Sequence, residues 1–308
     1  MTHYYSLNQY LYERFGTKVY KIALNGNMSC PNRDGSIGHK GCIFCSEGGS
    51  GDFAASPLMS VTEQIEEGKK LLSSKYHGNS YIAYFQAFTN TYAPLEYLER
   101  IFSEAINHPD IVCLSIATRP DCLDEDKINL LARLNRIKPV WVELGLQTIH
   151  ESTAAYIRRG YELPVFDHAM EMLNSAGIET IVHMIIGLPG ESHRMILETA
   201  RYIGMCGAKG IKLQLLHILK NTDLAAEYEK GQINVLSLEE YTEILMEILK
   251  VLPPQMVIHR LTGDGPKKLL IAPLWSADKK MVLNTINKAL LDNNIIQGSS
   301  YLGKDELS

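Results

Sequence analysis

Three cysteines in one polar loop are the residues best suited to chemistry. Cys30, Cys42 and Cys45 lie in the segment 25–51, which is rich in Gly, Asn and Ser. The two-residue gap between Cys42 and Cys45 brings two thiolates to one metal centre, and Cys30 can fold back across eleven residues to supply a third. Thiolates are the usual ligands of iron–sulfur clusters. The loop therefore predicts a metal centre.

A zinc site is the main alternative at this loop. His39 lies three residues before Cys42, so it could complete a closed site with the three cysteines. The loop by itself leaves cluster and zinc equally open. Its position favours a cluster, because it follows the first predicted strand of an α/β fold, at the edge where such folds place their chemistry. Three cysteines leave one iron open, and the amine and carboxylate of S-adenosylmethionine (SAM) could chelate it.

The loop is embedded in alternating apolar and amphipathic segments. Short, nearly continuous apolar runs are typical of strands covered on both faces, and they occupy residues 19–24, 81–88, 112–117, 140–146, 180–186 and 211–219. Helical patterns lie between them at residues 62–74, 95–107, 124–137, 165–176 and 193–206. Thr62, Asp124 and Ser192 are expected N-caps, and Gly177 is an expected helix stop.

This alternation predicts parallel strands joined by right-handed crossovers. Six such units make either a doubly wound sheet or an incomplete barrel, and the pattern does not choose between them. After residue 219 the rhythm changes to a long helix at 237–252, a strand at 256–261 and a closing helix at 279–292. No linker divides the chain. We therefore expect a core at 1–220 with an extension at 221–308 packed on it.

Composition limits the class of protein. With 308 residues, 45% of them hydrophobic, the chain can bury a core without help from a metal, so a metal centre would serve chemistry. Neither a leader peptide nor an apolar run of about 18 residues is visible, which predicts a cytoplasmic protein without a transmembrane helix. Cysteines of such a protein are thiols or ligands. Cys113, Cys122 and Cys206 form no close pair, and we interpret them as inert buried thiols.

The net charge argues against a broadly basic surface. Thirty Lys and Arg against 35 Asp and Glu give −5, whereas phosphate binding needs clustered cations. A local basic face is still compatible with an acidic protein. The clusters are Arg133, Arg136 and Lys138, then Lys267–Lys268 and Lys279–Lys280. Their simplest interpretation is a set of solvated helix faces.

At the cysteine loop the sequence resembles the radical SAM superfamily. Phe44 stands between the last two cysteines, where members usually carry an aromatic residue. The eleven residues between Cys30 and Cys42 exceed the usual three and are similar to the spacing in the Elongator catalytic subunit. The resemblance implies a partial (β/α)6 barrel of the TIM type, a [4Fe–4S] cluster on the three cysteines, and SAM as the second cofactor. Reductive cleavage of SAM would yield a radical that abstracts hydrogen from the substrate.

Later segments resemble the coproporphyrinogen dehydrogenase branch of that superfamily. Gln147 ends the fourth strand and Arg159 follows twelve residues later, like that branch's SAM-contacting pair. Residues 187–191, Gly-Leu-Pro-Gly-Glu, match its Gly-Leu-Pro-Gly motif. His183 stands where an Asp often meets the SAM ribose. Residues 86–90 replace a Gly-Gly-Glu-like segment, which implies SAM contacts from Gln86, Thr89 and Asn90.

Four polar residues have alternatives of their own. The Arg159 guanidinium could hold a carboxylate through two parallel bonds, or it is a surface cation. Glu143 has apolar neighbours, so it is expected in the barrel interior, bound to SAM or paired with an Arg. His183 could contact ribose, relay protons or be a hydrogen-bonded core residue. Arg119 ends the third strand and could bind substrate phosphate.

The whole chain resembles a small stand-alone family, the YtqA/YhcC type. Residues 259–265, which include His259, Arg260 and Asp264, are also similar to that family. The resemblance implies a tRNA substrate, with the carboxymethylaminomethyl group of the wobble uridine converted to aminomethyl. It also implies an electron donor of the flavodoxin or ferredoxin kind. A small metabolite such as a tetrapyrrole, or a zinc-stabilised binding module, remain the alternatives. Lys and Arg around the pocket mouth would favour tRNA, and a closed apolar pocket would favour a metabolite.

Overall fold

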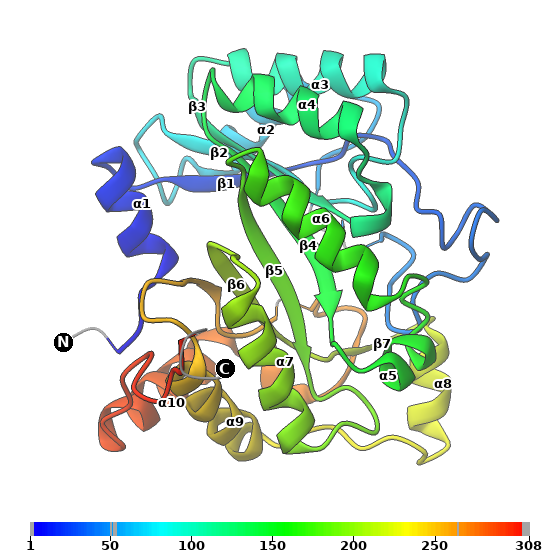
Figure 1. The fold of residues 1–308 in the computed structure, drawn as a ribbon, viewed down its shortest axis with the longest axis vertical. Helices are drawn as coiled ribbons and strands as arrows, with labels where there is room; N and C mark the ends of the chain where they lie inside the picture. Colours follow the sequence, from blue (N-terminus) through cyan, green and yellow to red (C-terminus); the bar gives the residue numbers. More distant parts are fainter. Residues whose placement is uncertain (1–2, 50, 52–53, 264, 304–308) are drawn as a thin grey trace.

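Seven parallel strands form one curved sheet. We analysed a computed structural model, which describes residues 3–49, 51, 54–263 and 265–303. The strand order is β1-β2-β3-β4-β5-β6-β8 (Figure 1). The strands are β1 Tyr20–Leu24, β2 Tyr81–Phe85, β3 Ile111–Thr118, β4 Val140–Gln147, β5 Glu179–Ile186, β6 Gly210–Leu215 and β8 Val257–Arg260.

This order decides between the two architectures that the sequence allowed. The first six strands lie side by side in chain order, so every crossover runs in the same direction and the sheet curls one way. A doubly wound sheet would reverse its order at a switch point. The expected incomplete barrel is confirmed. Strands β1 and β8 are its two edges, and a separate antiparallel pair is formed by β7 Ile218–Leu219 and β9 Leu270–Ala272.

Helices cover the outer face of the sheet (Figure 1). They are α2 Val61–Leu72, α3 Leu95–Asn107, α4 Glu125–Asn135, α6 Leu163–Ser175 and α7 His193–Met205, with shorter α5 Glu151–Tyr156 and α8 Asp223–Glu229 near the rim. Each long helix lies within three residues of its predicted bounds. The predicted caps Asp124 and Ser192 are confirmed, whereas the N-cap of α2 is Ser60 instead of Thr62. Ser60 and Glu63 form a capping box there, a pattern visible in the sequence.

Helix α1, Leu7–Phe15, was not predicted. It buries only Tyr10 and Leu11, which is too small a face for a clear helical pattern. These two residues pack against Trp141 and Val257, inside the amino-terminal end of the barrel. Tyr10 also donates a hydrogen bond to Glu179 over 2.6 Å. The helix therefore covers the end of the barrel opposite the cysteine loop.

The C-terminal segment completes the sheet as well as packing on it. Strand β8 pairs with β6. Helix α9, Leu238–Val251, precedes β8 in the sequence, and helix α10, Lys279–Asp292, follows it. The Gln297 side chain accepts a hydrogen bond from the Tyr5 main chain, which joins the two ends of the chain. The division at residue 220 stays a prediction. No helix in the described ranges combines the length and apolar content that crossing a bilayer requires.

Candidate cluster and cofactor site

A cavity of about 190 Å³ lies at the carboxyl ends of the strands. Cys30, Cys42 and Cys45 all line it, although they come from a loop that the chain completes before β2. The opposite walls are residues from the ends of β2 to β6 and β8. The cavity is thus the point at which the loop and the strand ends meet.

The middle of the Cys-x-x-Cys turn is held from both sides. The Ile43 amide donates to the Ile157 carbonyl over 3.2 Å, and the Ile43 carbonyl accepts from the Leu224 amide over 3.2 Å. The Ile43 side chain is buried in an apolar cluster with Leu188 of the Gly-Leu-Pro-Gly motif. Burial and hydrogen bonds together fix the turn on α5, α8 and β5.

Asn32 attaches the first half of the loop to the Arg159–Gly160 turn. Its amide nitrogen donates to the carbonyl oxygens of Arg158 over 2.7 Å and Arg159 over 3.3 Å, and it lies 3.6 Å from the Cys42 sulfur. Gly160 has a φ of +81°, and a Cβ at this position would lie 2.5 Å from Asn32 Oδ1. The close approach of the two loops therefore requires glycine.

We expect Gly160→Ala to lower the iron content of the reconstituted protein, because the added methyl group must push the cysteine loop outward. Gly177→Ala is the matched control, since Gly177 also has a positive φ of +67° but nothing within 4 Å of its missing Cβ. Both variants bear the backbone strain of about 1–2 kcal/mol. Iron per chain and urea unfolding measure the difference, and equal losses in both variants would contradict the packing role.

The donor set of the loop fits a cluster better than a closed zinc site. Tetrahedral zinc with Zn–S distances of about 2.3 Å places two sulfurs about 3.8 Å apart. Among the described residues, the three cysteine sulfurs do not form a group with all members within 4.8 Å of one another. His39, the fourth ligand that zinc would need, is exposed and does not line the cavity. This donor set fits a cluster, in which each thiolate binds a different iron.

The thiols affect one another electrostatically. Burial raises the pKa of the Cys42 thiol to about 12, and the neighbouring Cys45 and Cys30 act in the same direction, with Arg119 opposing them. Thiolates crowded into a buried pocket are unfavourable without a cation. Iron would supply the missing positive charge.

Most of the predicted SAM contacts lie around this cavity. Seven of the eight predicted residues line it, namely Phe44, Gln86, Thr89, Glu143, Gln147, Arg159 and His183. Gln147 has a φ of +69°, and its buried Oε1 atom has no hydrogen-bond partner among the described residues. An unpaired buried acceptor is costly unless a ligand supplies a donor. The ammonium or hydroxyl groups of SAM are donors of this kind.

Asn90 differs from its prediction. It does not line the cavity and is fully buried. Its amide nitrogen donates to the carbonyl oxygens of Phe85 over 3.1 Å and Ala117 over 2.9 Å. Asn90 therefore ties the ends of β2 and β3 together, a role that the strand-end position alone did not reveal.

Arg159 lines the cavity, and it is not the surface cation of its second interpretation. Its side chain is 2% exposed. The guanidinium donates to the Tyr161 carbonyl over 2.9 Å, the Thr148 carbonyl over 2.7 Å and the Glu151 carboxylate over 3.0 Å. These bonds direct the group at the main chain that follows β4. Arg159 thus shapes the turn after β4, which also carries Gly160.

The guanidinium of Arg119 is also bound by groups of the protein itself. It lines the cavity but forms a two-pronged ion pair with Asp121, with N–O distances of 2.9 and 2.7 Å. A third bond of 2.8 Å joins it to the Arg159 carbonyl. A substrate phosphate would have to compete with Asp121, so the arrangement gives Arg119 a positioning role beside the cysteines.

Glu143 lies in the barrel interior, as expected, at the centre of a buried polar network. Its partner is not an Arg. Its carboxylate accepts from Lys21 over 2.8 Å and forms a short contact with Lys212. His183 and Ser115 each lie 2.8 Å from its oxygens. Burial alone would raise the pKa of Glu143, but the two lysines and His183 outweigh it and hold that pKa well below its usual range.

The network also sets the charge of its other members. Burial lowers the pKa of Lys212 to about 7, Glu143 opposes this shift, and Lys21 and Arg260 add to it. Lys212 also donates to the Tyr84 hydroxyl over 3.0 Å. The sequence analysis did not predict Lys21, Tyr84 and Lys212 as site residues. The available signal was a lysine inside an apolar strand, as Lys212 is in the run 211–219.

We expect His183 to titrate with a midpoint of about 4, because burial, followed by Lys212, lowers its pKa and outweighs Glu143. The unfolded chain takes up this proton near pH 6.5. Acidification from pH 6.5 to 4 therefore costs stability, since the unfolded state binds more protons in that window. NMR titration of the ring checks this, and Lys212→Met should raise the midpoint. A midpoint near 6.5 in both proteins would contradict it.

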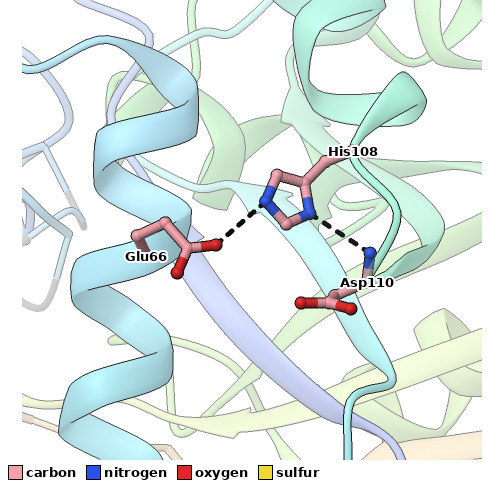
Figure 2. A group of neighbouring side chains, drawn as sticks. All are labelled: Glu66, His108 and Asp110. Atoms are coloured by element: carbon pink, nitrogen blue, oxygen red, sulfur yellow. Dashed lines mark hydrogen bonds and ion pairs between the residues drawn. The ribbon is translucent and has the colours of Figure 1, made fainter.

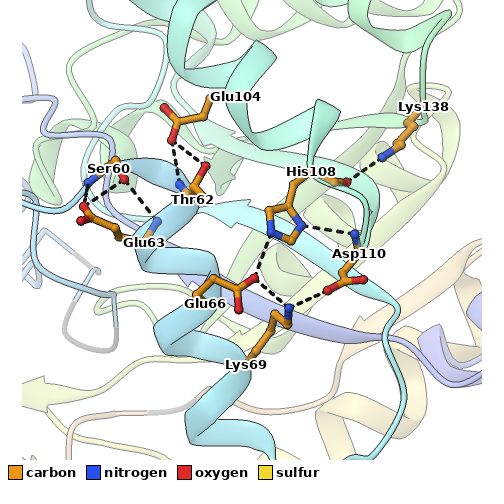
Figure 3. A network of polar contacts seen from close by, with 9 residues as sticks. All are labelled: Ser60, Thr62, Glu63, Glu66, Lys69, Glu104, His108, Asp110 and Lys138. Atoms are coloured by element: carbon orange, nitrogen blue, oxygen red, sulfur yellow. Dashed lines mark hydrogen bonds and ion pairs between the residues drawn. The ribbon is translucent and has the colours of Figure 1, made fainter.

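A second group of possible metal ligands lies at the other end of the barrel. Figure 2 shows Glu66, His108 and Asp110, whose ligand atoms lie within 4.8 Å of one another. The Lys69 ammonium occupies the cation position, 2.7 Å from Glu66 and 2.6 Å from Asp110 (Figure 3). His108 Nδ1 accepts from the Asp110 amide, so Nε2 carries the proton and faces Glu66. The group is an ion-pair network joining α2 to β3.

Two family models together match most of this chain. The sequence model of the Radical SAM superfamily matches residues 34–203, and the Radical_SAM C-terminal domain matches residues 208–292. Cys30 precedes the first match, so its place in the triad rests on the shared cavity.

Relatives cover nearly the whole chain. YtqA of Bacillus subtilis (strain 168) is 45% identical over 99% of this chain and 95% of its own length. YhcC of Escherichia coli (strain K12) is 35% identical over 94% and 93%. A tRNA uridine(34) acetyltransferase of Methanocaldococcus jannaschii is 25% identical over 52% of this chain and 30% of its own.

A solved structure supports the same fold. Archaeal Elp3 of Methanocaldococcus infernus superimposes with a TM-score of 0.69 at 18% identity, covering 91% of this chain, which spans 64% of that structure. The matching family models, the relatives in sequence and the similar fold all indicate the same superfamily. This chain therefore belongs to the radical SAM superfamily and to its YtqA/YhcC-type family, enzymes that work with a [4Fe–4S] cluster and SAM.

Proposed function

We propose that this radical SAM enzyme acts on tRNA and converts the carboxymethylaminomethyl group of the wobble uridine to aminomethyl. The observation that carries the proposal is a basic cavity beside the cysteine site. Its volume is about 780 Å³, and Lys21, Lys212, Arg260, Lys267, Lys268 and Lys279 line it. Among the described residues that line it there is no Asp or Glu. The net charge of the protein is negative, but the lining of this cavity is positive, as binding of a polyanionic substrate requires.

The basic cavity adjoins the cysteine cavity. Tyr84, Gln86, Lys212 and Arg260 line both. Lys267, Lys268 and Lys279 are exposed, so they form the outer part of the basic cavity. Asp264, also named from the sequence, lies outside the described residues. A nucleotide with its phosphates at the outer lysines can therefore direct its base toward the cofactor.

The cofactors would be held by residues described above. Cys30, Cys42 and Cys45 would hold the cluster, and Phe44, Gln86, Thr89 and Gln147 would contact SAM, with Gln147 Oε1 accepting a hydrogen bond. When bound, the cluster and SAM together supply a one-electron cleavage and a radical that removes hydrogen from substrate carbon. A flavodoxin- or ferredoxin-like protein would supply the electron. Asn32, Arg119 and Arg159 would keep the cysteine loop in place.

The name of one relative supports the substrate class. The Methanocaldococcus jannaschii relative is a tRNA uridine(34) acetyltransferase, but its similarity covers only about half of this chain. It therefore adds to the case for tRNA and leaves the chemistry of the modified group to experiment.

The proposal is tested by nucleoside mass analysis of tRNA from cells with and without the gene. Carboxymethylaminomethyl uridine should accumulate in the deletion strain, and a plasmid copy with Cys42→Ala should fail to reverse this. Unchanged nucleosides in a strain without a redundant enzyme would refute the tRNA proposal and direct the search to small metabolites. The superfamily assignment does not depend on this result.

We expect the double variant Lys267→Gln/Lys268→Gln to bind tRNA more weakly and with less dependence on salt. Each lost phosphate contact lowers the slope of log K against log salt by about one. Exposed Lys70 and Lys288 do not line the cavity, so Lys70→Gln/Lys288→Gln is the control with the same net charge. Fluorescence anisotropy over a salt series measures both. Equal slopes for the two variants would place the RNA elsewhere.

A further inference from the structure

Lys212 lies where the two cavities meet. It lines both the cysteine cavity and the basic cavity, whereas Lys21 lines only the basic one. His183, Lys212 and Arg260 are register partners on neighbouring strands β5, β6 and β8, which aligns them in one row. Lys212 is therefore one of the residues that a substrate group would meet between the basic cavity and the cofactor site.

The charges at this point are unequal. Two lysine side chains, Lys21 and Lys212, share the single carboxylate of Glu143. Burial and the nearby Lys21 lower the pKa of Lys212 to about 7, so a second anion is needed to hold both lysines in the ammonium form at neutral pH. The Glu143 and Lys212 side chains are 0% and 7% exposed, so water reaches this pair little, whereas the Lys21 side chain is 22% exposed. His183, neutral above pH 4, adds no charge. One further anionic group would balance the pair and restore favourable electrostatics in a site of low dielectric.

We infer that Lys212 and Lys21 bind the carboxylate of the substrate's carboxymethyl group, with Glu143 as the residue that positions both ammonium groups. This inference rests on the proposed function and names the part of the substrate that the site selects. The product side chain, aminomethyl, has lost that carboxylate and would be released. Lys21 lies away from the cysteine cavity, which assigns the pair to the substrate and not to the carboxylate of SAM.

The test compares two anticodon stem-loop RNAs that differ only in carrying carboxymethylaminomethyl or aminomethyl uridine. Binding is measured by anisotropy with the cluster-reconstituted protein and SAM, without a reductant, so that no turnover occurs. The unaltered protein should bind the first RNA about tenfold or more tightly than the second, because a charge-assisted contact is at stake. Lys212→Gln should abolish this preference, because it should weaken binding of the carboxymethylaminomethyl RNA more than binding of the aminomethyl RNA.

Lys209→Gln is the matched control. Lys209 precedes Lys212 by three residues, lies over the Tyr10 ring at 5.5 Å, and lines neither cavity. It should keep the preference. Lys212→Arg, which retains the charge, should keep most of it, and Lys21→Gln should reduce it. If Lys212→Gln does not fold, as judged by circular dichroism, Lys21→Gln and Lys212→Arg decide the matter.

The outcomes separate this inference from the proposed function. If the unaltered protein binds neither RNA, the tRNA proposal fails and the inference fails with it. If it binds both RNAs equally, or if Lys212→Gln weakens both by the same factor, tRNA remains the substrate and the carboxylate site is refuted. A preference that only the Lys212 and Lys21 variants lose supports the site.

Discussion

Alanine in place of Cys30, Cys42 or Cys45 is expected to reduce bound iron from about four atoms per chain to nearly none after anaerobic reconstitution. The three thiols line one cavity, and the loop that carries them is attached to the barrel at Asn32 and Ile43. Two remaining thiolates leave two irons without protein ligands. The absorbance of the cluster and the reductive cleavage of SAM should disappear together with the iron.

Cys206→Ala is the control for this experiment. Cys206 follows α7 and does not line the cysteine cavity, so its removal should leave iron and sulfide unchanged. Zinc is measured in the same samples. One zinc per chain without iron would overturn the cluster assignment and revive a binding module, because a closed zinc site leaves no open coordination position for SAM.

The second large effect is expected from Glu143→Gln. The substitution keeps the shape of the side chain but leaves buried Lys212 and partly buried Lys21 without their counter-ion. Breaking a buried ion pair in this way costs about 3–5 kcal/mol. The midpoint of urea unfolding should therefore fall clearly, with little change in slope.

Glu99→Gln is the corresponding surface control. Glu99 pairs with Arg133 at 2.9 Å, and both side chains are about half exposed, so the loss should be at most about 1 kcal/mol. Glu143→Gln combined with Lys212→Met should cost less than the sum of the single changes, because the pair is coupled. A loss for Glu143→Gln as small as that for Glu99→Gln would show that the interior is hydrated and that the two lysines do not depend on Glu143.

The local sequence was sufficient to predict the repeating elements and the metal-binding loop. Apolar runs and amphipathic patterns report which face of a strand or helix is buried, and this property depends on near neighbours in the chain. The Cys-x-x-Cys spacing is local in the same sense. Helix α1 was not predicted because it buries only Tyr10 and Leu11, which give no clear helical periodicity. Its capping residues, Ser6 and Gly16, are the features of the sequence that indicate it.

Only the tertiary structure decided what the polar residues do. Arg159 follows α5 and Asn90 follows β2, and most of their donors are bound to main-chain carbonyls that no sequence pattern displays. The pairing of Glu143 with Lys21 and Lys212 joins residues 122 and 69 positions apart. Sheet curvature and strand register bring them together, because each inward side chain meets partners from distant strands. Residue type and spacing along the chain determined the chemistry available to this protein, and the curvature of the sheet determined which groups face one another to use it.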